Sequence, residues 1–192
     1  AFLCLPDPAA VEAVSMVDNP NTAIIDTSTA HRTADGWTYG FPELAGLRER
    51  VKASKRIANP GCHASGFVGL VEPLVREGLI DKSAKLSCFS LTGYSGGGKK
   101  MIAEYEEEGR DVLLDAPRMY GISQNHKHLK EMKAICGLEV APVFCPIVAP
   151  YYSGMEVTVP LFAEDVKGGA EAIKALYREY YKNGLVRFMD AD

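Results

Sequence analysis

The sequence predicts two kinds of architecture: a parallel α/β sheet over residues 1–60, and an α+β region with a mixed or antiparallel sheet and helices on one face over residues 61–192. Near the start, two apolar runs flank a helical segment, which is the pattern of a parallel crossover unit. After residue 62, strand-like segments no longer alternate regularly with helices. The composition, 47% hydrophobic and 24% charged, is that of an ordinary globular protein.

The first part opens with the apolar run 1–5, which we expect to be a fully buried strand. Asp7 is predicted to cap the following helix, whose apolar residues Val11, Val14 and either Met16 or Val17 should face inward. The expected elements of this part are the strand at 1–5, a helix at 8–17, a strand at 22–26, a helix at about 42–54 and a strand at 55–59.

The second part begins with a helix from Cys62 to about Gly78, whose apolar side chains recur at helical spacing. We expect the acidic run 104–108 to be the solvated face of a helix. The remaining expected elements are a strand at 85–92, a glycine-rich loop at 93–98, strands within 138–147 and 155–162, and a last helix at 165–183.

Composition excludes several classes of function. The net charge of -4 gives no reason to expect nucleic acid or an anionic membrane as a partner, and no stretch approaches the roughly 20 apolar residues of a membrane span. The chain has five cysteines and no CxxC pair, which favours reduced thiols in a cytoplasmic enzyme over disulfides or zinc. We expect no metal site.

The run Asn59-Pro60-Gly61-Cys62 places a cysteine at the junction between a turn and a helix. A helix N-terminus carries unpaired N–H groups and a partial positive charge, and both favour a thiolate. Cys62 is therefore a candidate nucleophile. The alternative is that it is a small buried hydrophobic residue.

Two histidines, His126 and His128, are candidates for the proton transfer that such a nucleophile needs. Residues two positions apart point in different directions, so at most one should face the cysteine. The alternative is that both are ordinary exposed histidines.

Two further segments have the composition of ligand sites. The stretch Gly93-Tyr94-Ser95-Gly96-Gly97-Gly98-Lys99 offers backbone N–H groups that a phosphate or a flat cofactor ring can approach, unless it is only a flexible surface loop. Arg32 follows the strand at 22–26, and ligands of α/β folds bind beyond the carboxyl ends of strands. It is thus a candidate to hold an anionic group, with Arg118 and Lys127 as weaker ones.

Taken together, these segments resemble the N-acetyl-γ-glutamyl-phosphate reductases, in particular their second, shorter subtype. The motifs that carry the resemblance run through most of the chain: Phe2-Leu3-Cys4-Leu5-Pro6-Asp7, Asp26-Thr27-Ser28-Thr29-Ala30-His31-Arg32, Tyr39-Gly40-Phe41-Pro42-Glu43-Leu44, Asn59-Pro60-Gly61-Cys62-His63, the glycine stretch at 93–99, Tyr120-Gly121, and His126-Lys127-His128 with Glu131.

The resemblance implies the end of a Rossmann-type NADP-binding domain over 1–60, and a catalytic and oligomerisation domain like that of glyceraldehyde-3-phosphate dehydrogenase over 61–192. It implies that Cys62 attacks an acyl phosphate to form a thioester, that NADPH reduces this to the semialdehyde, and that His126, with His128 as second choice, is the acid–base residue. The substrate-binding residues it implies are Ser28, Arg32, Asn59, Arg118, Tyr120, His128 and Glu131. The NADP-binding residues it implies are Leu5, Pro6, Ser95, Gly96 and Gly98. It also implies a homo-oligomer, a dimer or a tetramer.

The chain departs from the family pattern at both ends. The amino-terminal strand with its glycine fingerprint and a carboxy-terminal segment are absent, so we expect weak NADPH binding. Three alternatives stay open: a related semialdehyde dehydrogenase acting on another acyl phosphate, a non-redox cysteine acyl-transferase or hydrolase, and a catalytically silent oligomerisation fragment.

Overall fold

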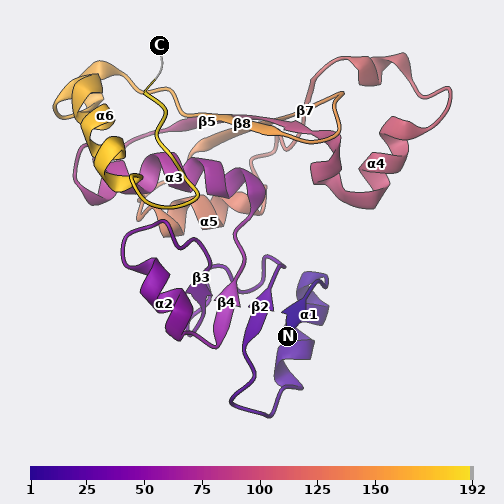
Figure 1. The fold of residues 1–192 in the computed structure, drawn as a ribbon. Helices are drawn as coiled ribbons and strands as arrows, with labels where there is room; N and C mark the ends of the chain where they lie inside the picture. The colour runs from indigo at the N-terminus through magenta and orange to yellow at the C-terminus, as the bar shows by residue number, and fades with distance from the viewer. Residues whose placement is uncertain (191–192) are drawn as a thin grey trace.

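Two four-stranded sheets, separated by a layer of helices, make up the computed structural model, which describes residues 1–190. In Figure 1 the first sheet lies at the bottom with the N-terminus, the second lies at the top, and helices α3 and α5 lie between them. The expected combination of a parallel sheet and a mixed sheet is confirmed.

The first sheet is entirely parallel, in the order β1-β2-β4-β3. Its strands are β1 (Phe2–Leu3), β2 (Ile24–Asp26), β3 (Thr38–Tyr39) and β4 (Arg56–Ala58). Its helices are α1 (Asp7–Ser15), between β1 and β2, and α2 (Leu47–Ala53), which is shorter than expected. Since all four strands run the same way, the segments that follow β1, β2 and β4 lie at one edge of the sheet, the edge that leads to α3.

Three expectations for the first elements were wrong. Phe2 is 75% exposed because β1 is an edge strand of the sheet, so the strand is not fully buried. Val11 and Met16 are exposed as well, and Ala10 is the buried residue of α1. Asp7 lies inside the helix after Pro6, and its carboxylate accepts hydrogen bonds from Thr29 instead of capping α1.

The second sheet is mixed, in the order β6-β7-β5-β8. β5 (Ser87–Gly93) is parallel to β7 (Val143–Ala149) and antiparallel to β8 (Met155–Thr158), while β6 (Arg118–Met119) is antiparallel to β7. Helices cover only one face, as Figure 1 shows. The other face, here called the open face, presents Phe89, Leu91, Val143, Cys145 and Ile147.

The main hydrophobic core lies where α3 (Cys62–Arg76) and α5 (His128–Ile135) pack against the second sheet. Phe67 and Phe144 are its largest fully buried side chains, and Tyr39 of the first sheet belongs to the same cluster. Gly66 lets α3 approach β8 closely, because a Cβ there would lie 2.4 Å from the side chain of Val157. The core therefore joins both sheets through α3.

The glycine stretch was expected to be a loop. Instead it forms the 3-10 helix η1 (Tyr94–Gly97) and the start of α4 (Gly98–Glu106). The acidic run begins on α4 and is exposed except for Tyr105, which stacks on Tyr94 at 4.7 Å between ring centroids. With η2 (Val112–Asp115), these helices extend beyond the end of the second sheet (Figure 1).

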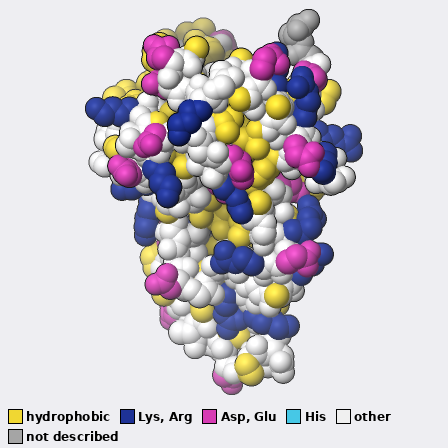
Figure 2. Space-filling model, turned by 90° about the vertical axis from the view of Figure 1, so that its left-hand side faces the viewer, with side chains coloured by type: hydrophobic (Ala, Val, Ile, Leu, Met, Phe, Trp, Pro, Cys, Tyr) yellow, Lys and Arg dark blue, Asp and Glu magenta, His cyan; other side chains and the backbone are white. Residues whose placement is uncertain are grey.

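The last elements are η3 (Ala163–Asp165) and α6 (Gly169–Tyr180), so the last helix is shorter at both ends than the expected 165–183. Viewed from the side of Figure 2, hydrophobic side chains gather in the broad upper half of the molecule, and fewer of them lie at the narrow lower end. Within residues 1–190, none of the helices has the length and apolar composition that crossing a membrane requires.

Candidate active site

Cys62 is the first residue of α3 and lies just beyond the carboxyl end of β4. The backbone N–H of Asn59 donates to the carbonyl of Asp26 at 2.7 Å, which prolongs the pairing of β2 and β4 up to the turn. Gly61 is the extended N-cap of α3, and its carbonyl accepts from the N–H of Ser65 at 2.8 Å. The Cys62 side chain is exposed at the positive end of a 15-residue helix, which is the setting that favours a thiolate.

A buried ion pair fixes this turn. Glu131 of α5 is 2% exposed and accepts from the Gly61 N–H at 2.8 Å, from Arg32 at 3.0 Å and from the Tyr39 hydroxyl at 2.7 Å. Arg32 also donates to the carbonyls of Asn59 and Thr27. Arg32 and Glu131, both expected to bind substrate, thus hold the backbone that leads into Cys62.

Gly61 is required by the crowding of this turn. A Cβ at this position would lie 2.4 Å from Nε2 of His128 and 2.5 Å from the guanidinium of Arg32. Any side chain would therefore separate the turn from the groups that hold it.

A second buried carboxylate, Asp26, organises the segment after β2. It accepts from the N–H of Ser28 at 2.9 Å, from the Ser28 hydroxyl at 2.7 Å and from His31 at 2.6 Å. Burial opposes ionisation of Asp26, but the hydrogen bonds from His31 and Ser28 outweigh it and hold the pKa of this carboxyl below its ordinary value. The side chain of Ser28, another predicted substrate residue, is oriented by Asp26.

Three histidines come together beside Cys62. The ring centroid of His63 lies 5.9 Å from that of His126 and 5.5 Å from that of His128, and the last two lie 4.7 Å apart. Burial lowers the pKa of all three, to about 4 for His63 and about 3 for His128. They are therefore neutral at pH 7.

His126 is the most accessible of these rings, whereas His128 is buried. Its Nδ1 accepts from the backbone N–H of His128 at 3.3 Å, so the proton of the neutral ring resides on Nε2. His126 thus presents a hydrogen-bond donor on its free side. His128 has its Nδ1 buried without a partner among the described residues.

Tyr120 lies beside two of these histidines. Its hydroxyl lies 2.8 Å from Nε2 of His63, and its ring centroid lies 5.9 Å from that of His126. Burial and the negative charge of the Cys62 thiolate raise the pKa of Tyr120 to about 12. Tyr120 and His126, two of the predicted site residues, therefore lie together with His63, the residue that follows Cys62.

Comparison with known proteins identifies the family of this chain. Residues 62–192 match the family model described as "Semialdehyde dehydrogenase, dimerisation domain". The chain belongs to this family. The part that matches this dimerisation-domain model comprises the second sheet and its helices, and its first residue is Cys62.

The curated relatives are N-acetyl-gamma-glutamyl-phosphate reductases. One from Rhizobium meliloti is 42% identical, over 100% of this chain and 64% of the relative. Another, N-acetyl-gamma-glutamyl-phosphate reductase 2 from Nostoc sp., is 41% identical over 95% of this chain and 59% of the relative. The resemblance seen in the motifs is thus confirmed, and the chain spans about 60% of the length of these relatives.

Solved structures confirm the fold of the semialdehyde dehydrogenase family. Aspartate semialdehyde dehydrogenase II from Vibrio cholerae, complexed with ASA, aligns with a TM-score of 0.67 at 14% identity, over 100% of this chain and 65% of that structure. The enzyme from Candida albicans with NADP aligns with a TM-score of 0.63 at 19% identity, over 94% and 55% of the two chains.

Other predicted residues lie farther from the cysteine cluster or make local contacts. Asn59 is exposed, and its amide donates to the carbonyl of Pro60. Arg118 pairs with Glu104 at 3.0 Å and lies over the ring of Tyr105, on the outer helical segment. Because Arg118 is paired with Glu104, it does not bring a free positive charge to Cys62.

The predicted NADP-binding residues lie in two places. Leu5 and Pro6 are exposed and follow the carboxyl end of β1. Gly96 and Gly98 are exposed beside the half-buried Ser95, and nothing lies within 4 Å of a Cβ built at Gly98. These backbones are open to approach by a ligand.

The sequence motifs assigned no role to three residues that lie in the site or hold it in place: His63, Ser90 and Gln124. His63 adjoins Cys62 in the sequence, which is the only signal that pointed to it. Gln124 has a left-handed backbone, with φ of 57°, and its amide makes two hydrogen bonds to the backbone of Phe144, at 2.7 and 2.8 Å. It attaches the segment that carries His126 to β7, as a neighbouring strand would.

One further finding concerns metals. Residues 1–190 contain no group of three or more His, Cys, Asp or Glu side chains placed to hold a metal ion.

Proposed function

We propose that this chain carries the acylation and proton-transfer site of an N-acetyl-γ-glutamyl-phosphate reductase, which reduces N-acetylglutamyl 5-phosphate to the 5-semialdehyde and phosphate with NADPH, in arginine biosynthesis. The observation that carries the proposal is an exposed cysteine on the first turn of α3 beside Tyr120 and three neutral histidines. The identity of 41–44% to curated reductases supports this substrate class.

In the first step, the Cys62 thiolate attacks the acyl carbon, the carbon–oxygen bond to phosphate breaks, and a thioester forms on the sulfur. The N-terminus of α3 stabilises the thiolate before the attack. The Arg32–Glu131 pair keeps the turn before Cys62 in place, so the sulfur needs no rearrangement to react. The substrate contacts predicted for Ser28, Arg32 and Glu131 stay predictions.

His126 holds a proton on Nε2, next to Tyr120. We propose that it donates a hydrogen bond to the substrate oxygen that gains charge, first when the thioester forms and again when it is reduced. Burial, together with the neighbouring Lys127, lowers the pKa of His126, which keeps the ring neutral and in this donor form at pH 7. His128 is less suited, since it is buried behind Gly61.

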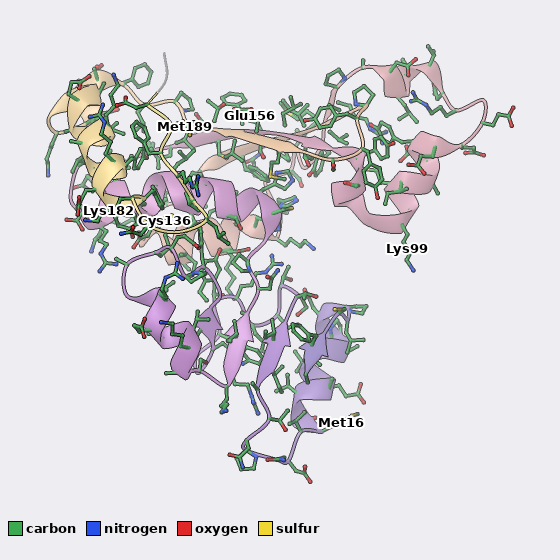
Figure 3. All side chains as sticks on the ribbon, viewed as in Figure 1. Met16, Lys99, Cys136, Glu156, Lys182 and Met189 are labelled. Atoms are coloured by element: carbon green, nitrogen blue, oxygen red, sulfur yellow. The ribbon has the colours of Figure 1, made fainter. Side chains whose placement is uncertain are left out.

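The open backbones at the end of β1 and at Ser95–Gly98 fit an NADP molecule, which in a parallel α/β sheet lies beyond the carboxyl ends of the strands. Leu5, Pro6, Ser95, Gly96 and Gly98 would hold it. When bound, NADPH supplies the hydride that reduces the thioester. Lys99 extends from the start of α4 on the side of the second sheet where the first sheet lies (Figure 3), and it would add a positive charge for an anionic cofactor.

A homo-oligomer in the cytoplasm is the assembly we propose. The family is named for dimerisation, and the open face of the second sheet presents apolar side chains such as Phe89 and Val143 that no helix covers (Figure 1). Pairing of two such faces would remove this apolar surface from water.

Phosphate-dependent reduction of NADP⁺ by N-acetylglutamate 5-semialdehyde tests the function in the reverse direction. We expect activity of the full-length open reading frame that Cys62→Ser abolishes, while Cys4→Ser, at another exposed cysteine, leaves it unchanged. Undiminished activity of Cys62→Ser would remove the nucleophile. A preference for aspartate semialdehyde would change the substrate, and an absence of NADP⁺ reduction would favour a hydrolase.

A further inference from the structure

A cavity of about 400 Å³ lies between the first part of the chain and the helices α3 and α5. Its walls come from the segment 32–50, which follows β2 and reaches into α2, and from one side of the two helices. In Figure 1, α2 lies beneath α3 and α5. Among the lining residues, all in the described part of the chain, none belongs to the turn at 59–63. The size and the position between two layers of the fold are those of a small-molecule site.

One wall of this cavity is apolar. Trp37, the single tryptophan of the chain, lies on it together with Leu44, Leu47 and Ile135. The indole ring is stacked on the ring of His31, with 4.0 Å between the centroids and 17° between the planes. The stacking fixes the indole as a flat apolar surface, against which the apolar body of a ligand can pack.

Part of the rim is fixed by hydrogen bonds that join Ala45 to α3 and α6. Arg76 donates to the Ala45 carbonyl at 3.0 Å, and the Ala45 N–H donates to the hydroxyl of Tyr180 at 2.8 Å. The same hydroxyl donates to the carboxylate of Glu72 at 2.8 Å, and Glu72 lies 3.5 Å from Arg76. These contacts hold the segment and the helices at a set distance, so the cavity is preformed.

The cavity has an excess of positive charge. Three guanidinium groups line it, those of Arg32, Arg50 and Arg76, against the single carboxylate of Glu72. Arg32 is paired with Glu131 at 3.0 Å, and Arg76 with Glu72. Arg50 has no carboxylate within ion-pair distance among residues 1–190. The uncompensated charge is therefore that of Arg50, and an anionic group would complete it.

We propose that this cavity is a second ligand site, which takes a small organic carboxylate with a flat apolar body. The body packs against Trp37 and its apolar neighbours, and the carboxylate lies against the guanidinium of Arg50. This proposal does not depend on the role of Cys62 as a nucleophile.

The site borders the network that supports the cysteine. Arg32 and Tyr39 line the cavity, and both donate to Glu131, at 3.0 and 2.7 Å. Glu131 in turn accepts from the N–H of Gly61, which precedes Cys62. A ligand in the cavity thus contacts this network without covering the sulfur, so it should not exclude a reagent from Cys62.

Hippurate, a carboxylate with a phenyl ring, is the probe, and hippuramide, which has the same shape without the charge, is its control. Because Trp37 lines the cavity, its fluorescence reports binding in the chain as it stands. We expect a saturable change with a dissociation constant of about 1 mM for hippurate, and binding of hippuramide that is about threefold weaker. The absence of a saturable change up to about 20 mM hippurate would overturn the proposal.

Three variants locate the ligand. Arg50→Gln should weaken hippurate binding about threefold and leave hippuramide binding unchanged, because it removes the unpaired charge. Ala134→Leu places a larger side chain on the cavity wall and should weaken both ligands by about tenfold or more. Arg48→Gln makes the same change on α2 outside the cavity, where Arg48 pairs with Glu43, and should change neither constant. Equal effects of the two arginine variants, or unaltered binding to Ala134→Leu, would contradict the assigned position.

Alkylation by iodoacetamide, followed by peptide mass spectrometry, separates this site from the cysteine site. At saturating hippurate, Cys62 should still be alkylated, with the exposed Cys4 as reference in the same molecule. Protection of Cys62 but not of Cys4 would mean that hippurate occupies the cysteine site, and the second site would be wrong.

Discussion

Removal of the carboxylate of Glu131 should destabilise the whole chain, because three separate elements are joined through it. It accepts hydrogen bonds from the Gly61 N–H, the Arg32 guanidinium and the Tyr39 hydroxyl, and both charged side chains are nearly inaccessible to solvent. In Glu131→Ala the buried charge of Arg32 loses its partner, which costs about 3–5 kcal/mol. That is a large part of the ~5–15 kcal/mol that stabilises a typical domain.

Urea unfolding, followed by the fluorescence of the single tryptophan, measures this loss. Glu131→Gln is the matched variant: it keeps an acceptor for Gly61 and Tyr39 but removes the charge, so its loss should be smaller. The exposed pair of Lys52 and Glu49, 2.7 Å apart with side chains 64% and 76% exposed, provides the control. Glu49→Ala should change the unfolding free energy by less than about 1 kcal/mol.

A double variant tests the cause. Since the main cost is the uncompensated charge, Arg32→Leu combined with Glu131→Leu should be less destabilising than the sum of the two single changes. Losses that simply add, or a Glu131→Ala loss no larger than that of Glu49→Ala, would refute the idea that this pair joins the two sheets.

Three further expectations concern other parts of the molecule. Gln124→Ala should lower the unfolding free energy by about 1–3 kcal/mol and reduce kcat, since the segment that carries His126 loses its attachment to β7; an unchanged kcat would contradict this positioning role. Lowering the pH from 7 to 5 should reduce the unfolding free energy of the wild type by about 2 kcal/mol more than that of His63→Gln. The reason is that a histidine with a pKa of about 4 when folded and about 6.5 when unfolded takes up its proton mainly on unfolding. Parallel pH profiles of urea unfolding for the two proteins would contradict this. Phe89→Glu on the open face should weaken self-association in sedimentation velocity, whereas Val11→Glu, on exposed α1, should not; equal effects would place the interface elsewhere.

The sequence predicts well those features that depend on local patterns. The helix after Cys62 and the strand at β5 have clear apolar spacing, and both formed close to the expected residues. The exposure of Phe2 and Val11 could not be predicted, because it depends on the position of β1 at the edge of the sheet, and strand order is a property of the assembled fold.

The same distinction between local and long-range features applies to the candidate site. The position of Cys62 at the start of a helix was predictable because a helix N-terminus is a local feature. The contact of Arg32 with Glu131 joins residues 99 positions apart, and that of His63 with Tyr120 joins residues 57 apart, so neither has a local signal. The glycine stretch was expected to be a loop, but it forms a 3-10 helix, and the first two N–H groups of that helix, at Tyr94 and Ser95, donate to the distant carbonyls of Tyr151 and Tyr152.

The most direct test of the central claim is to look for an acyl group on Cys62. The chain would be incubated with N-acetylglutamyl 5-phosphate without NADPH, digested, and analysed by peptide mass spectrometry, with Cys62→Ser as a parallel sample. We predict a hydroxylamine-sensitive thioester on the peptide that contains Cys62, and none on the peptide of Cys4, which is exposed as well. Acylation of both cysteines to the same extent, or of neither, would contradict the assignment of Cys62 as the nucleophile.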